Sequence, residues 1–223
     1  MIDIVSATRL SPRDFWAKSA LGKSLTRLTQ DKRVRARIAF SNRKGLPEIY
    51  NSRINAPDAQ DVLLFVHDDV WLDDAQLVDR LLEGLERYDV IGVAGNRRRV
   101  PFQPAWLFLD MQFTWDTANL SGAVGHGQQA HGQISAFGDT PADCELLDGV
   151  FLAARTHTLR SRSVAFDQRF KFHMYDMDFC RTARQQGLRL GTWPIAITHQ
   201  SEGAFATPSW SEQLRAYLEK WES

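Results

Sequence analysis

The sequence predicts an α/β protein built on a mixed, mostly parallel sheet. Over the first hundred residues, short apolar runs typical of strands alternate with capped or amphipathic helical segments. Such alternation is typical of parallel strands joined by right-handed helical crossovers. The run Val62–Val66 is apolar throughout, as expected of a strand buried on both faces. A chain of 223 residues has the length of one α/β domain with a substantial core.

The individual elements of the first half follow from local signals. The strands are apolar and short, a Ser-Pro pair at Ser11 starts the first helix, and Pro47 opens the second. The third helix carries leucines at a period of 3.6 residues. In chain order, we expect strands at 2–5, 37–40, 62–66 and 90–94, and helices at 11–28, 47–54 and 74–87.

The second half is less regular. Residues 101–143 show little periodicity and many glycines, and a loop of this length is usually functional or mobile. Regular elements return as an apolar run at 145–155, a helix at 176–186 and closing strands within 188–198. A last helix is predicted from the capping box Ser209–Glu212. Its apolar stripe is expected to form either core or a dimer surface.

The composition excludes several classes of protein. Its 27 basic and 27 acidic residues give no basic excess, which argues against a duplex-binding or polybasic membrane protein, so no nucleic-acid partner is expected. The basic clusters 31–37 and 97–99 could face phosphates or simply solvent. Two cysteines without metal-ligand spacing indicate a reducing, cytoplasmic compartment. The strand-like start and the absence of an apolar run of about 18 residues predict a protein that is soluble, or at most peripheral to the inner face of a membrane.

The strand at Val62–Val66 ends abruptly in His67, Asp68 and Asp69. In open α/β sheets, ligands bind at the carboxyl ends of the strands. Carboxylates at that edge can hold Mg²⁺ or Mn²⁺, and the cation can hold a diphosphate. Helix capping is the alternative, and it fits Asp73 and Asp74 better because they directly precede the predicted helix.

Four segments occur in the order found in one enzyme family. They are LLFVHDDV, LLDGVFLAAR, FDQRFKFHMYDMDFCRTARQQG and WPIAITHQSEG. Together they resemble the DxD-type strand end, the Asp-Gly strand, the acid-headed helix and the closing histidine strand of the inverting, family 2 type GT-A glycosyltransferases. The resemblance runs from Ile2 to about Gly203. It implies the GT-A (Rossmann-like) nucleotide-diphospho-sugar transferase architecture in a single domain.

The resemblance also implies roles for individual residues. Asp69 and His199 would bind a divalent cation, Mn²⁺ or Mg²⁺, which neutralises the leaving diphosphate. Asp176 would act as the general base that makes transfer inverting, while Asp178 would anchor the helix start. The donor contacts would be Ser6, Thr8, Asn42, Asp68, Asp148 and Gly149. For Asn42 a purely turn-forming role is the alternative.

The implied reaction moves a sugar from a nucleotide-diphosphate donor to a hydroxyl of a glycan, a lipid-linked acceptor or a cell-surface polysaccharide. Residues 1–100 would bind the nucleotide, 101–203 would bind the acceptor and hold the base, and 204–223 would form the last helix. We expect residues 101–143 to cover the donor or to line the acceptor groove, with Trp106 or Trp115 stacking on a sugar.

Two positions depart from the family pattern. His67 stands where the first aspartate of the DxD pattern is expected, and Tyr175 stands where a glutamate commonly precedes Asp176. These departures keep open a non-catalytic sugar- or nucleotide-binding module of the same fold. A nucleotidyltransferase is a further alternative, but it normally needs a glycine-rich loop after the first strand, and SATRLSPRD contains no glycine.

Overall fold

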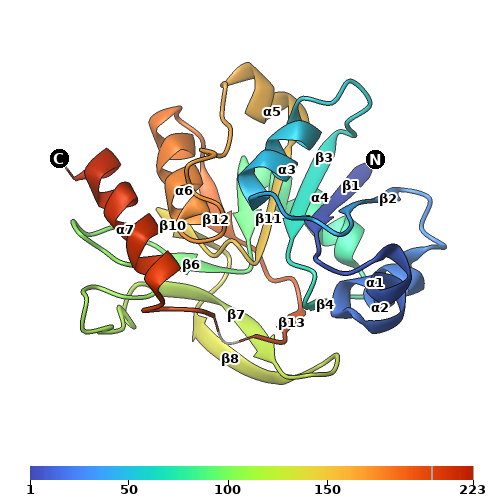
Figure 1. Ribbon diagram of the computed structural model, residues 1–223, viewed down its shortest axis with the longest axis horizontal. Coiled ribbons are helices and arrows are strands. Elements are labelled where there is room, and N and C mark those ends of the chain that lie inside the picture. The colour runs from blue at the N-terminus through green and yellow to red at the C-terminus, as the bar shows by residue number, and fades with distance from the viewer. Residues whose placement is uncertain (202, 223) are drawn as a thin grey trace.

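The computed structural model describes residues 1–201 and 203–222, which form two sheets, with helices around the main sheet and the β7–β8 pair, residues 120–138, at the lower edge of the view (Figure 1). None of the described helices is both long and apolar enough to cross a bilayer. The strands are β1 Ile2–Ala7, β2 Val34–Ala39, β3 Val62–Val66, β4 Val70–Leu72, β5 Val90–Gly92, β6 Ala94–Asn96, β7 Leu120–His126, β8 Gln133–Gly138, β9 Ala142–Asp143, β10 Leu146–Leu147, β11 Phe151–Arg155, β12 Leu190–Thr192 and β13 Ile197–His199. The helices are α1 Pro12–Lys18, α2 Ala20–Leu28, α3 Leu46–Ile54, α4 Leu77–Arg87, α5 Thr156–Ser161, α6 Tyr175–Gln185 and α7 Pro208–Trp221.

The main sheet has the strand order β2-β1-β3-β11-β5-β12-β9. β1 pairs in parallel with β2 and β3, and β5 pairs in parallel with β12. β11 runs antiparallel to both of its neighbours, β3 and β5, and β9 runs antiparallel to β12. The predicted mixed, mostly parallel sheet is therefore confirmed. All five residues of β3 are buried, as their uniform apolar character predicted.

The second sheet has the order β10-β6-β7-β13-β4, with β8 paired to β7. The expectation of one long loop at 101–143 is wrong for its second part, because β7, β8 and β9 lie there. Glycines hide these strands from a hydrophobicity pattern, since they stand where backbones approach closely. A Cβ at Gly138 would lie 2.2 Å from the carbonyl oxygen of Leu120, and one at Gly122, which has φ +94°, would lie 2.0 Å from that of Val93.

Two predicted helices need correction, one because it is interrupted and the other because it begins earlier. The helix predicted over 11–28 breaks at Ser19, whose extended conformation ends α1 and whose side chain caps α2 by accepting from Gly22 N–H. The last helix is capped by Thr207 rather than by the Ser209 capping box. The predicted stripe of α7 is core and not a free dimer surface, because Trp210 and Leu214 are buried against the rest of the chain.

Asp178 holds α7 against α6. Its side chain is completely buried, and Oδ1 accepts a hydrogen bond of 2.7 Å from Trp221 Nε1–H and lies 2.6 Å from Lys220 Nζ. Arg181, one turn further along α6, pairs with Glu222. Asp178 is therefore structural, as expected, but it joins two helices and does not cap its own.

Replacing Asp178 with Asn should lower stability. The amide oxygen can still accept from Trp221, but the loss of the charge removes the buried one of the two ionic partners of Lys220 and leaves Asp167, which costs about 1–3 kcal/mol. Urea denaturation measures the change. Asp79→Asn is the matched control, because Asp79 is 65% exposed and pairs only with Arg33 at the surface. Equal stability of the two variants would contradict this role of Asp178.

Candidate active site at the junction of the two sheets

The turn His67–Asp69 lies where the two sheets meet. It follows β3 of the main sheet and leads directly into β4, which pairs with β13 of the second sheet. His67 N–H donates to the Val150 carbonyl, which continues the ladder between β3 and β11. The side chains of this turn therefore face segments that come from both sheets.

The register between β4 and β13 brings Asp69 and His199 together. Val70 pairs with His199, and Gln200 N–H donates to the Asp69 carbonyl. As a result, Asp69 Oδ1 lies 3.2 Å from His199 Nε2. Burial opposes charge on both groups, yet their mutual attraction prevails: the pKa of Asp69 is lowered to about 2 and the pKa of His199 is raised. The predicted metal pair is thus in contact.

His67 completes a group of three metal-binding side chains. One ligand atom from each of His67, Asp69 and His199 lies within 4.8 Å of the other two, and all three residues are half-buried. Two imidazoles and a carboxylate are suitable ligands for a divalent transition metal. The sequence prediction did not include His67. The signal was present, because a histidine at the first DxD position is itself a metal-binding residue type.

Asp176 stands in the first turn of α6 and faces the Asp148–Gly149 turn. Its Oδ2 accepts from Gly149 N–H at 3.0 Å, and its Oδ1 accepts from Met177 N–H at 2.9 Å. Burial, reinforced by the charge of Asp148, raises the pKa of Asp176 to about 6. Such a carboxylate is ionised at neutral pH and is a stronger base than an exposed aspartate.

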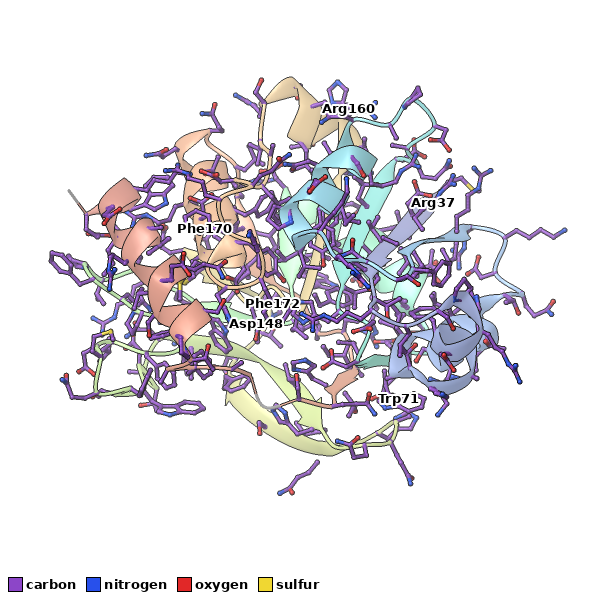
Figure 2. All side chains as sticks on the ribbon, viewed as in Figure 1. Arg37, Trp71, Asp148, Arg160, Phe170 and Phe172 are labelled. Atoms are coloured by element: carbon purple, nitrogen blue, oxygen red, sulfur yellow. The ribbon has the colours of Figure 1, made fainter. Side chains whose placement is uncertain are left out.

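Tyr175 and Gly149 connect the base-bearing helix to the acidic turn. Tyr175 Oη donates to the Gly149 carbonyl at 2.8 Å and also lies 2.8 Å from His67 Nε2. A Cβ at Gly149 would lie 2.4 Å from Tyr175 Oη, so only glycine permits this approach. Figure 2 shows the neighbouring Asp148 near the centre of the molecule. Gly149 thus allows the Tyr175 hydroxyl to lie close to the backbone, and its predicted contact with the donor stays a prediction.

Of the remaining predicted donor residues, two are buried and two are half-buried. Ser6 and Thr8, at the end of β1, are 0% and 3% exposed, and Thr8 Oγ1 accepts from Leu10 N–H. Asn42 bonds to Lys44 through both ends of its amide, as a turn-forming asparagine does. Asp68 is half-buried between β3 and β4. Contact of these four side chains with a donor stays a prediction.

The two tryptophans that were expected to stack on a sugar differ in their exposure to solvent. Trp106 is 6% exposed and packs edge-on against Phe137, so it is a core residue and not a platform for a sugar. Trp115 is 50% exposed and remains available for stacking. Phe172, which the sequence prediction missed, is 51% exposed and stacks on His67 with ring centroids 5.7 Å apart. Figure 2 labels Phe172 near the middle of the view.

The segment that carries Phe172 is fixed by α7. The backbone N–H groups of Lys171, Phe172 and His173 all point to Gln213 Oε1, at 2.7, 3.3 and 3.3 Å. Three convergent donors hold this segment in a single conformation. The last helix therefore positions an aromatic ring at the candidate site.

Four arginines of the two basic clusters form ion pairs within the chain. Arg33 and Arg37 of the first cluster, and Arg98 and Arg99 of the second, each lie within 3.2 Å of an acidic side chain. Ion pairing on the protein surface accounts for these arginines without a phosphate.

Solved structures with the same fold are glycosyltransferases. The catalytic domain of Drosophila beta1,4-galactosyltransferase 7, solved with xylobiose, matches with a TM-score of 0.52 at 10% identity, covering 96% of this chain and 79% of that one. GalNAc-T7 with UDP, GalNAc and Mn²⁺ matches with a TM-score of 0.52 at 12% identity, covering 100% and 49%. A mannosyltransferase of Pyrobaculum calidifontis with GDP-Man and Mn²⁺ matches with a TM-score of 0.50 at 9% identity, covering 97% and 68%. At these identities the likeness shows the GT-A fold.

Sequence comparison supplies the family. No curated protein sequence matches the chain. A family model described as a glycosyltransferase-like family matches residues 23–219, which is most of the chain and includes all four motif segments. The protein therefore belongs to this glycosyltransferase-like family.

Proposed function

We propose that the protein is a metal-dependent, inverting glycosyltransferase that uses a nucleotide-diphosphate sugar and a hydroxyl acceptor. The observation that carries the proposal is the hydrogen-bonded connection between Asp176 and the candidate metal group: Asp176 accepts from Gly149 N–H, and Tyr175 joins the Gly149 carbonyl to His67 of the His67–Asp69–His199 group. A base and a cation site on opposite sides of one sugar are what inverting transfer requires.

Asp69 and His199 would hold the cation, and their ligand atoms fit one, since they are 3.2 Å apart and each lies within 4.8 Å of a ring nitrogen of His67. When bound, a divalent cation would neutralise the negative charge of the departing nucleoside diphosphate. Mn²⁺ complexes of UDP and of GDP-Man in two proteins of the same fold support a nucleotide donor and this type of ion.

Asp176 would take the proton of the acceptor hydroxyl. As the hydroxyl oxygen attacks the anomeric carbon, the bond from that carbon to the diphosphate oxygen breaks, and the hydroxyl proton moves to the Asp176 carboxylate. The N–H groups of Gly149 and Met177 orient the carboxylate for this transfer. Attack from the face opposite the leaving group inverts the anomeric carbon.

The acceptor would be the hydroxyl of a glycan, of a lipid-linked sugar or of a cell-surface polysaccharide, and a cytoplasmic setting would supply the donor. Trp115 and Phe172 offer exposed aromatic faces of the kind that stack on sugar rings. The xylobiose complex of the Drosophila enzyme supports a saccharide acceptor.

A thermal-shift screen of sugar nucleotides, with and without Mn²⁺, tests the proposal. A donor present at 100 times its Kd should stabilise the protein by about 2.7 kcal/mol, which corresponds to a rise in Tm of about 5–10 °C. The donor that stands out is then incubated with the protein and Mn²⁺ but without acceptor. Slow release of nucleoside diphosphate supports an enzyme. Binding without any hydrolysis or transfer would instead indicate a non-catalytic binding module.

A further inference from the structure

The two residues that depart from the family pattern lie within hydrogen-bonding distance of each other. His67 replaces the first aspartate of the DxD pattern and Tyr175 replaces the glutamate before the base, and His67 Nε2 lies 2.8 Å from Tyr175 Oη. The two residues are 108 positions apart in the sequence, so only the folded structure shows that they are in contact. An imidazole therefore stands where the family pattern has a carboxylate, and the Tyr175 hydroxyl lies within hydrogen-bonding distance of that imidazole.

We propose that His67 is the third protein ligand of the cation, that Tyr175 holds it in position, and that the site therefore selects a first-row transition metal such as Mn²⁺ over Mg²⁺. The proposal rests on the proposed function for the presence of a cation at this edge. It adds which residues bind the cation and which ion they prefer.

The hydrogen bonds of Tyr175 determine which nitrogen of His67 is free. A hydroxyl has one proton, and Tyr175 donates it to the Gly149 carbonyl, which can only accept. Tyr175 Oη must then accept from His67, and we assign the imidazole proton to Nε2. The lone pair of the neutral ring is left on Nδ1, the nitrogen available to a metal. A second partner that fixes the tautomer is the usual support of a metal-binding histidine.

Packing fixes the plane of the same ring. Phe172 stacks on His67 at an interplanar angle of 25°, and the Gln213 side chain holds the Phe172 backbone. The imidazole is therefore restrained from its Nε2 side and from one face. The two other ligand atoms, Asp69 Oδ1 and His199 Nε2, are 3.2 Å apart, close to the separation of neighbouring ligands around an ion with bonds of about 2.1 Å.

The choice of ligands sets the preference for metal. Mg²⁺ prefers an all-oxygen shell, whereas imidazole favours transition metals. A site with two imidazoles and one carboxylate should bind Mn²⁺, and Co²⁺ still more strongly, in preference to Mg²⁺. A His67→Asp variant restores the family pattern and should shift the preference back toward Mg²⁺.

Metal binding to the whole protein, without nucleotide, tests the proposal. The electron paramagnetic resonance signal of free Mn²⁺ measures its affinity, and Mg²⁺ is added as a competitor. His67→Ala should weaken Mn²⁺ binding by about 10- to 100-fold. His67→Asp should keep Mn²⁺ binding but lower the Mg²⁺ concentration needed for displacement by about 10-fold or more. His157→Ala is the control, since His157 is exposed and follows the far end of β11.

Tyr175 is tested by a double-mutant cycle. Tyr175→Phe should weaken Mn²⁺ binding in the parent, because the ring loses its anchor, but should have no further effect in the His67→Ala background. An effect of equal size in both backgrounds would make Tyr175 a general structural residue and would refute its positioning role.

The proposal is overturned if the parent does not bind Mn²⁺, if His67→Ala binds it as tightly as the parent, or if His67→Asp leaves the competition by Mg²⁺ unchanged. These outcomes differ from failure of the proposed function. Selective Mn²⁺ binding without donor hydrolysis would refute the enzyme and leave the metal site intact. Mn²⁺-dependent hydrolysis with His67→Ala binding Mn²⁺ normally would refute the ligand and leave the enzyme intact.

Discussion

Asp176→Asn should reduce glycosyl transfer by on the order of 10²- to 10⁴-fold, the usual contribution of a general base. Asparagine keeps the size of the side chain but cannot accept the hydroxyl proton. Donor affinity should change little, because the proposed base faces the acceptor and not the diphosphate. Until an acceptor is known, donor hydrolysis can serve as the assay, with water in place of the hydroxyl.

The pH dependence of the parent gives a second measurement of the same group. Burial raises the pKa of Asp176 to about 6, and only its ionised form can act as a base. With respect to this group, transfer should be nearly constant above about pH 7, fall to half at about pH 6 and decrease about tenfold per pH unit well below that. The Asp176→Asn variant should lack this acidic limb.

Asp178→Asn is the matched control for the base, two residues further along the same helix. Its carboxylate faces Trp221 and Lys220, so the variant should lose stability and retain most of its turnover per folded molecule. If Asp176→Asn hydrolyses donor normally while Asp178→Asn is inactive, the two roles are reversed. Full transfer activity in both variants would refute the inverting mechanism.

Asp69→Asn should abolish Mn²⁺-dependent binding of the donor. Of the three proposed ligands, Asp69 alone supplies negative charge, and a neutral amide oxygen is a much poorer partner for a divalent cation. Isothermal titration of the nucleoside diphosphate with and without Mn²⁺ measures the loss. His199→Ala should weaken binding less, because water and the phosphates can complete the coordination shell.

Loss of folding must be separated from loss of metal. Burial opposes the charge of Asp69, but His199 and His67 hold its pKa at about 2, so its carboxylate stabilises the fold above its ordinary pKa of 3.8, and this stabilisation is lost as the pH falls toward 2. Asp69→Asn should therefore remain folded at neutral pH with a modestly lower Tm. Asp61→Asn is the control, since Asp61, just before β3, is 83% exposed and forms its ion pair with the N-terminus. Unchanged Mn²⁺ dependence in Asp69→Asn would refute the metal assignment.

The limits of the sequence prediction are clearest in residues 120–143. No clear strand pattern was visible there because glycines stand at several strand positions, and β8 is largely exposed. Gly122 and Gly138 lie against the backbones of Val93 and Leu120, and those contacts exist only after the strands have paired. The same limit applies to Trp106, whose burial depends on Phe137 in β8.

The sequence by itself determined the α/β class, the buried strand β3 and the position of an acidic turn at its carboxyl end. These features are local, because a run of apolar residues reports burial and a strand end reports an edge of the sheet. Only the tertiary structure decided that His67 meets Tyr175, that Asp178 holds α7, and that Gly149 lies against Tyr175. Each of these contacts depends on the packing of segments distant in the sequence, which no local pattern encodes.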